Sequence, residues 1–188
     1  MKINLSHTVH FFLVFMTVLC HGCDKDMSGK DKQNVPSDSS EITISDLSSS
    51  DITRLAEMRA KVESYWPDNI PKERYGEPIG KLALLDRMFQ EAQVDRENTY
   101  LLHSMGVVLG DVIAEEFGLE WVAYQDQYGH EIALQVPGKS ITLFPKTMIS
   151  KRIEDGEDVR VAGLYEGLKE QLQQVIEDPE VKSSTSSP

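Results

Sequence analysis

The sequence is poor in the residues on which most catalytic and metal sites depend. Its two cysteines, Cys20 and Cys23, both lie near the N-terminus, so they cannot link distant parts of a folded domain. Only two histidines, His103 and His130, follow them, which is too few for a histidine-based zinc site. The chain also lacks a glycine-rich phosphate loop, a nucleophile elbow and a metalloprotease helix motif. We therefore expect no catalytic residue, no metal and no other cofactor.

Positive charge is the second shortage. The 188 residues include 31 acidic and 19 basic side chains, which gives a formal net charge of -12. Sequence-independent binding to nucleic acid or to anionic lipid requires a basic surface. The composition argues against both functions and favours a basic protein partner, which the negative field would attract.

A long hydrophobic segment is missing as well. The apolar run FFLVFMTVL at residues 11–19 is too short to span a bilayer as a helix. Its length fits the hydrophobic region of a secretory signal peptide. We place this signal peptide at residues 1–22.

Gly22 and Cys23, which follow this run, resemble the end of a bacterial lipoprotein signal, where a small residue precedes the lipidated cysteine. Cys20 departs from the pattern, which prefers leucine at that position. The resemblance implies a lipid anchor on Cys23, and Asp24 resembles the signal that retains such proteins in the inner membrane. Ordinary cleavage before Cys23, without lipidation, is the alternative. We therefore expect a protein anchored by lipid on the periplasmic side of the bacterial envelope.

Two segments have the composition of flexible chain. Residues 23–50 are rich in Ser, Asp and Lys, and residues 179–188 are rich in Ser, so neither buries enough apolar surface to offset its conformational entropy. We interpret them as a tether and a tail. Residues 51–178 remain as a single domain, and the hydrophobic content of 40% is enough for a core.

Apolar residues recur at helical spacing in five stretches of this domain. Ser49 or Ser50 can cap the first helix, and Pro67 ends it. The third has the strongest signals, because Asn98 can cap it and Gly118 is a typical C-terminal stop. The expected helices cover roughly residues 51–66, 79–94, 98–117, 145–156 and 159–176.

Between residues 119 and 143 the hydrophobic period changes to alternation, which indicates strands. Gly129 and the pair Pro137-Gly138 mark two turns that are too short for a parallel crossover. We therefore predict an α+β domain in which a small antiparallel three-stranded meander packs against about five helices.

A series of short motifs runs through this part of the chain. They are Gly118-Leu119, Glu120-Trp121, Asp126 with Tyr128-Gly129, Phe144-Pro145, residues 148–152 and Gly156-Glu157. In this order they resemble the bacterial domain-of-unknown-function family numbered 3806. The resemblance implies a domain with this order of elements. It implies no activity, because the family has no assigned chemistry.

One face of the third helix is a candidate ligand face. Gly106 and Gly110 lie four residues apart, and a glycine in a helix interior costs about 1 kcal/mol relative to alanine, so we expect something to approach closely there. Asp111 and Glu115 lie one turn apart, a spacing that a cation site or an acid/base pair can use. Close packing of another element against the glycines, with the carboxylates on a solvated face, is the alternative.

A second set of residues forms a candidate partner-contact surface. Tyr124 and Tyr128 lie on or beside the predicted hairpin, and aromatic residues are enriched at contact hot spots. Lys146, Lys151 and Arg152 follow the third strand and precede four acidic residues. These charges either meet a charged partner or pair with one another.

Two functional hypotheses follow. The first is a non-catalytic, membrane-tethered binding protein of the periplasm, with a basic toxin or an envelope component as partner; an immunity protein that inhibits an envelope-acting toxin is one version. The second is an envelope enzyme or small-ligand binder that uses Gly106, Gly110, Asp111 and Glu115.

Overall fold

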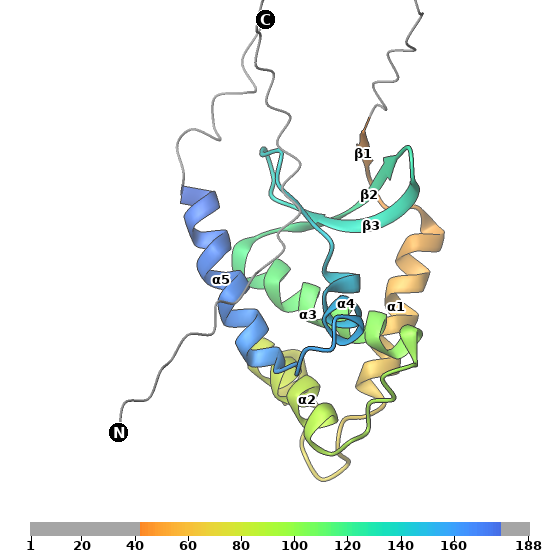
Figure 1. Cartoon of the computed structure of the whole chain (residues 1–188), viewed down its shortest axis with the longest axis vertical. Coiled ribbons are helices and arrows are strands. Elements are labelled where there is room, and N and C mark those ends of the chain that lie inside the picture. Colours follow the sequence, from red (N-terminus) through yellow and green to blue (C-terminus); the bar gives the residue numbers. More distant parts are fainter. Residues whose placement is uncertain (1–41, 178–188) are drawn as a thin grey trace, which may run out of the picture. The chain divides into compact units, whose positions relative to one another are not determined.

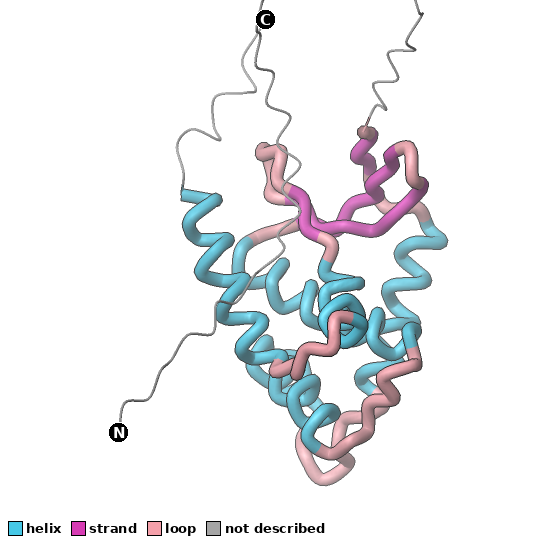
Figure 2. The backbone as a smooth tube through the Cα atoms, viewed as in Figure 1, coloured by secondary structure: helices cyan, strands magenta, loops and turns pink. Residues whose placement is uncertain are grey.

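The computed structural model describes residues 42–177 (Figure 1). The predicted signal peptide at residues 1–22, the lipidation site Cys23 and the tail at residues 179–188 lie outside the described residues. The described part contains five α-helices and four strands. Figure 2 shows the strands gathered at one end, with the helices on one side of them.

Helix α1, Ser49–Glu63, begins with a reciprocal hydrogen-bonded cap. The Ser48 hydroxyl accepts from the Asp51 backbone N–H at 3.2 Å, and the Asp51 carboxylate accepts from the Ser48 backbone N–H at 3.1 Å. The expected caps, Ser49 and Ser50, are wrong. Only Ser48 is followed three residues later by a carboxylate, and that spacing makes a capping box.

Helix α2, Pro78–Gln90, follows a 3-10 helix at Lys72–Gly76 and ends earlier than its hydrophobic pattern predicts. Ala92 has a left-handed backbone, with φ of 53°. The Gln93 N–H then donates to the Met88 carbonyl at 3.0 Å. The left-handed residue that ends a helix in this way is usually glycine. Because alanine occupies it here, the sequence gave no signal for the end of α2.

Helix α3, Thr99–Phe117, is the centre of the fold and contacts α1, α2, α4 and α5. Asn98 accepts from the Leu101 N–H at 3.0 Å, and Gly118 ends the helix with φ of 65°. Both predicted ends are confirmed. Residues on several sides of the helix are buried because other elements pack around it: Leu101, Leu102, Met105, Val107, Val108, Leu109, Val112 and Ile113.

The sheet has four antiparallel strands in the order β1-β2-β3-β4. Their bounds are Thr43–Ser45 for β1, Glu120–Asp126 for β2, Gly129–Gln135 for β3 and Thr142–Leu143 for β4. The α+β class and the antiparallel meander are confirmed, but the prediction of three strands is wrong. The additional strand, β1, comes from residues that we expected in the flexible tether.

The two faces of the sheet have different surroundings. Ile132 packs with Leu55 and Met58 of α1, and Trp121 packs against the same cluster, so these side chains point toward the helices. Side chains alternate along a strand, so Tyr124 of β2 points to the opposite face. Ile44 is the register partner of Tyr124 and therefore shares that face.

After β4 the chain returns to the helical layer. It forms a 3-10 helix at Pro145–Thr147, then α4 at Met148–Glu154 and α5 at Val161–Glu177. The Asp86 carboxylate of α2 accepts from the backbone N–H groups of Val161 at 2.7 Å and Ala162 at 3.3 Å. A side chain from another helix thus caps α5 and joins it to α2.

Candidate functional site

The glycines of α3 make room for the chain that follows β4. A Cβ atom at Gly106 would lie 2.4 Å from the Lys146 carbonyl oxygen and 2.5 Å from that of Pro145. At Gly110 it would lie 2.6 Å from the Trp121 ring and 2.7 Å from the Pro145 ring. We call this contact, made by Gly106 and Gly110 with residues 145–146 and Trp121, the α3 seam. Protein atoms fill the predicted ligand face, so that prediction is corrected in favour of close packing.

Asp111 lies beside the α3 seam and is fully engaged by two other side chains. Its carboxylate accepts two hydrogen bonds from the Arg59 guanidinium of α1, both at 2.7 Å, and one from Trp121 Nε1 at 2.9 Å. The Asp111 side chain is only 17% exposed. The hydrogen bond that Arg59 donates to Asp111 raises the pKa of the guanidinium. This paired, bidentate geometry joins α1, α3 and β2.

Tyr75 lies within the electrostatic reach of the same ion pair. Burial raises the pKa of Tyr75 to about 12, and the negative charges of Glu63 and Asp111 add to the effect. Its ring meets the Trp66 ring at a centroid distance of 5.5 Å. A phenol with such a pKa keeps its proton at neutral pH, so it does not provide a base here.

Glu115, the second predicted carboxylate, serves a different contact. It lies 3.4 Å from Lys81 Nζ of α2, and its side chain is 53% exposed. Asp111 binds α1 whereas Glu115 faces α2, so the two carboxylates do not converge on one cation or one substrate atom. The predicted acid/base pair is therefore corrected to two separate ion pairs.

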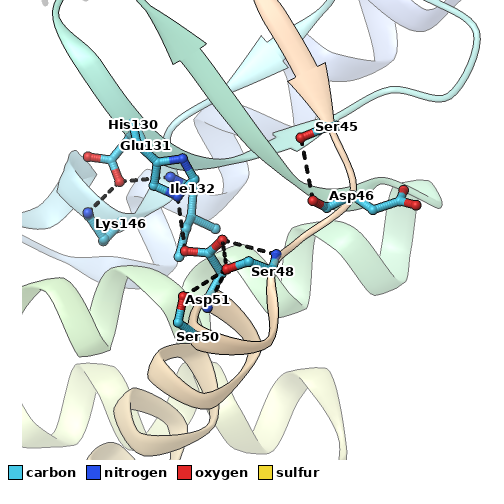
Figure 3. Close-up of polar contacts among 9 residues, drawn as sticks. All are labelled: Ser45, Asp46, Ser48, Ser50, Asp51, His130, Glu131, Ile132 and Lys146. Atoms are coloured by element: carbon cyan, nitrogen blue, oxygen red, sulfur yellow. Dashed lines mark hydrogen bonds and ion pairs between the residues drawn. The ribbon is translucent and has the colours of Figure 1, made fainter.

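The five predicted partner-contact residues differ in exposure. Lys146 is only 8% exposed and pairs with Glu131 of β3, so its assignment to a contact surface is wrong (Figure 3). Arg152 is half-buried and donates to the Met148 carbonyl at 2.7 Å, and burial lowers its pKa. Lys151 is exposed. A nonlocal partner for Lys146, fifteen residues away, explains why the sequence pattern misled.

The charge of Lys146 acts on a neighbour in α3. His103 is half-buried, and burial lowers its pKa, with a further lowering by the Lys146 ammonium. The carboxylate of Glu131 acts in the opposite direction. The charges of the Lys146–Glu131 pair thus act in opposite directions on the pKa of this imidazole.

Tyr124 lies on the sheet and Tyr128 lies beside it. Tyr124 is half-buried, and its ring meets Phe144 edge to face at a centroid distance of 5.1 Å. Tyr128, in the β2–β3 turn, is 89% exposed. Tyr128 therefore offers a free aromatic surface, whereas Tyr124 offers only part of its ring.

Sequence reasoning missed the residues around the start of α1. Ile42 is 48% exposed and Ile44 is 37% exposed, beside Tyr124. Asp51, which closes the cap of α1, also lies 3.0 Å from His130 Nε2 of β3 (Figure 3). The alternation Ile42-Thr43-Ile44-Ser45 is a strand signal, but the serine-rich segment around it concealed it.

A groove of about 200 Å³ lies between the C-terminal part of α2 and the start of α5. It is lined by Asp86, Phe89, Gln90, Asp158, Val159 and Arg160. The carboxylate of Asp86 is already bound to the first N–H groups of α5. In residues 42–177 no three His, Cys, Asp or Glu side chains lie close enough to hold a metal ion. None of the helices in these residues is long and apolar enough to cross a membrane.

These features define a class of protein, a small α+β domain with helices packed on one face of an antiparallel sheet. Residues 81–165 match the family model described as "Domain of unknown function (DUF3806)", which supports the family resemblance of the sequence. None of the curated proteins compared with the chain matches it.

One similar solved structure supports the fold. It comes from Bacteroides thetaiotaomicron, shares 14% sequence identity and has a TM-score of 0.56. The match covers 69% of this chain and 48% of that one, so the chain spans about half the length of the similar protein. At this identity the likeness concerns the fold alone.

Proposed function

We propose that the chain is a non-catalytic binding protein of the bacterial envelope that contacts a protein partner through the exposed part of its sheet. One observation carries the proposal. Exposed apolar and aromatic side chains gather at β1, the residue before it and the β2–β3 turn, where Ile42, Ile44 and Tyr128 are 48%, 37% and 89% exposed. The polar groups that suggested chemistry, Asp111 above all, are bound to other side chains of the domain.

The partner is a basic protein, because the chain carries a net charge of -12 and opposite charges speed encounter. An envelope-acting toxin is one such partner, and the chain then acts as an immunity protein that covers part of the toxin. A basic component of the envelope is the other.

The protein works from a lipid anchor on Cys23, on the periplasmic side, with Asp24 favouring the inner membrane. Metabolic labelling with a fatty-acid analogue tests the anchor. We expect labelling of the wild type and of Cys20→Ser, which lies within the predicted signal peptide, and no labelling of Cys23→Ser. Equal labelling of both variants contradicts lipidation at Cys23.

Site-specific photocrosslinking in cells tests the binding function. A photoreactive amino acid replaces Tyr128 in one variant and Ile79 in another; Ile79 is 73% exposed and lies on α2, away from the sheet (Figure 1). We expect the probe at Tyr128 to capture one defined protein that the probe at Ile79 does not capture. The proposal fails if both positions give the same products, or if neither gives any.

A captured toxin separates the two versions of the proposal. Co-expression of the chain then protects cells from that toxin, and a Tyr128→Ala variant protects less. A captured envelope component without toxicity argues against the immunity version and leaves the binding function.

A further inference from the structure

In the described part of the chain, β1 is the end strand of the sheet and pairs only with β2. In an antiparallel ladder, every second residue of an end strand turns its N–H and C=O away from the neighbouring strand. All three residues of β1 are exposed. We call residues 42–46 the β1 edge.

The β1 edge has few of the features that prevent strand pairing. Proteins protect such edges with proline, with lysine or by shortening the strand. Residues Thr43–Ser45 contain neither proline nor a charge, and only their short length opposes pairing. At the other side of the sheet β4 has two residues, Leu143 is buried, and Pro145 lies two residues beyond it. The β1 edge is therefore the more accessible of the two.

The side chains at the β1 edge add an apolar strip. Ile44 is the register partner of Tyr124, and Ile42 lies two residues earlier on the same face. Tyr128, at the nearby end of the β2–β3 hairpin, extends the exposed aromatic surface. A partner strand that has apolar residues at alternate positions and pairs with β1 would continue this strip.

The charges around the β1 edge are acidic at both ends. Asp46 follows β1 directly and is exposed. Asp126 lies at the other end, one residue beyond the pair Thr43↔Gln125, beside Ile42. Both carboxylates favour a partner strand with basic residues at its ends.

The same charges disfavour a second copy of the chain. Antiparallel pairing of two β1 strands about Ile44 places Asp46 of each copy opposite Ile42 of the other. Asp126 then lies about 10 Å away, which is two strand spacings. Like charges thus lie across from each other at both ends of such a dimer, whereas a basic chain is attracted at both ends, so we take a different, basic chain as the occupant.

We propose that the β1 edge accepts an extended, basic segment of a protein partner as a fifth strand of the sheet. The inference rests on the proposed binding function and names the mode and chemistry of recognition. Backbone hydrogen bonds supply affinity, alternate apolar side chains meet Ile42 and Ile44, and terminal lysines or arginines meet Asp46 and Asp126.

A short peptide of this pattern tests the proposal directly. The probe is a fluorescein-labelled Lys-Thr-Val-Thr-Val-Thr-Lys peptide, in which lysines and valines share one face as Asp46, Ile44 and Ile42 do. Its anisotropy is followed on titration with the full chain in mild detergent. The matched control peptide replaces both lysines with glutamate. We expect saturable binding of the basic peptide that weakens with salt, and at least about tenfold weaker binding of the acidic one.

Two exposed isoleucines provide matched protein variants. Ile44→Lys places a positive charge on the β1 edge, whereas Ile52→Lys places the same charge on α1, where Ile52 is 56% exposed. We expect Ile44→Lys to weaken binding of the basic peptide at least about tenfold and Ile52→Lys less than about threefold. Circular dichroism of both variants establishes that each is folded.

The results separate this inference from the proposed function. If the basic peptide does not bind at concentrations up to about 1 mM, or if both lysine variants bind it equally, the β1 edge is not the docking site. Capture of a partner at Tyr128 then still supports the binding function. Loss of that capture in Ile44→Lys, but not in Ile52→Lys, supports both.

Discussion

The α3 seam and the β1 edge differ most in packing: the first is closely packed and the second is exposed. At the α3 seam the backbone of residues 145–146 lies so close to Gly106 that no side chain fits between them. At the β1 edge three successive residues are exposed and one side of the strand pairs with no described strand. The first region holds parts of the fold together, whereas the second leaves backbone groups exposed, as the proposed docking of a partner strand requires.

The comparison shows how two different physical causes give similar sequence signals. Paired glycines and nearby carboxylates on one helix can mark a ligand groove, but the same pattern arises where a chain crosses the helix closely. Burial decides between the two. Asp111 is 17% exposed and paired to Arg59. The carboxylate that suggested a ligand site therefore joins α3 to α1.

Gly106→Ala is the strongest test of the α3 seam. The new Cβ would lie 2.4 Å and 2.5 Å from two backbone oxygens, so the chain at residues 145–146 must shift. We expect a loss of about 2–3 kcal/mol in the free energy of unfolding, after allowing for the helix propensity of alanine. Urea unfolding measures the loss.

Gly163→Ala is the matched control within α5. Its Cβ meets nothing closer than 4.0 Å, so alanine should stabilise the protein by about 0.5–1 kcal/mol. Equal stability of the two variants would mean that the seam tolerates a side chain, and the contrast with the β1 edge would then disappear.

Asp111→Ala is the second test and removes the carboxylate beside the seam. Trp121 Nε1 loses its acceptor and Arg59 loses its partner. Because the Arg59 side chain is 36% exposed and water can solvate it, we expect a loss of only about 2 kcal/mol.

The control is Glu115→Ala, one turn further along α3. Glu115 is 53% exposed and its ion pair with Lys81 is long, so the change in unfolding free energy should stay below about 0.5 kcal/mol. Similar losses for both variants would mean that the Asp111 contacts add little beyond a surface ion pair.

Sequence reasoning predicted the parts of the fold whose signals are local. Helix α3 is the clearest case, because Asn98 and Gly118 mark its ends within the sequence itself. The alternation in β2 and β3, with the turn at Gly129, likewise gave the hairpin. The end of α2 was missed because alanine at position 92 adopts a backbone that usually requires glycine.

The candidate site was harder to predict because its contacts join distant parts of the chain. Arg59 and Asp111 are 52 residues apart, and Lys146 meets Glu131 on another strand. Strand β1 has only three residues and depends on β2 for its pairing, so its local signal is weak. Such pairs follow from tertiary packing, which no local pattern encodes.

Asp51→Asn tests the junction between α1 and the sheet, next to the β1 edge. The hydrogen bond from the Ser48 hydroxyl, followed by the contact with His130, lowers the pKa of Asp51 from its ordinary 3.8, although burial opposes this. At pH 7 we expect the variant to be less stable by about 1 kcal/mol, because the charged acceptor of the capping box is lost.

The pH dependence of this difference has a definite sign. The pKa of Asp51 is lower in the folded state, so its contribution is complete above about pH 4 and is lost as the pH falls through the folded-state pKa. Urea unfolding of wild type and variant between pH 7 and pH 2.5 measures the gap. A gap that stays constant down to pH 2.5 would show that the carboxylate charge is not what stabilises the cap.

Ile44→Lys should have the smallest effect on stability and completes the comparison. Ile44 is 37% exposed on an end strand, and the lysine side chain can keep its methylenes against Tyr124 while its ammonium reaches water. We expect a change in unfolding free energy within about 0.5 kcal/mol, as is usual for surface positions. If the substitution lowers the free energy of unfolding as much as Asp111→Ala does, then Ile44 stabilises the fold as the α3 seam does. The β1 edge would then not be an exposed docking site.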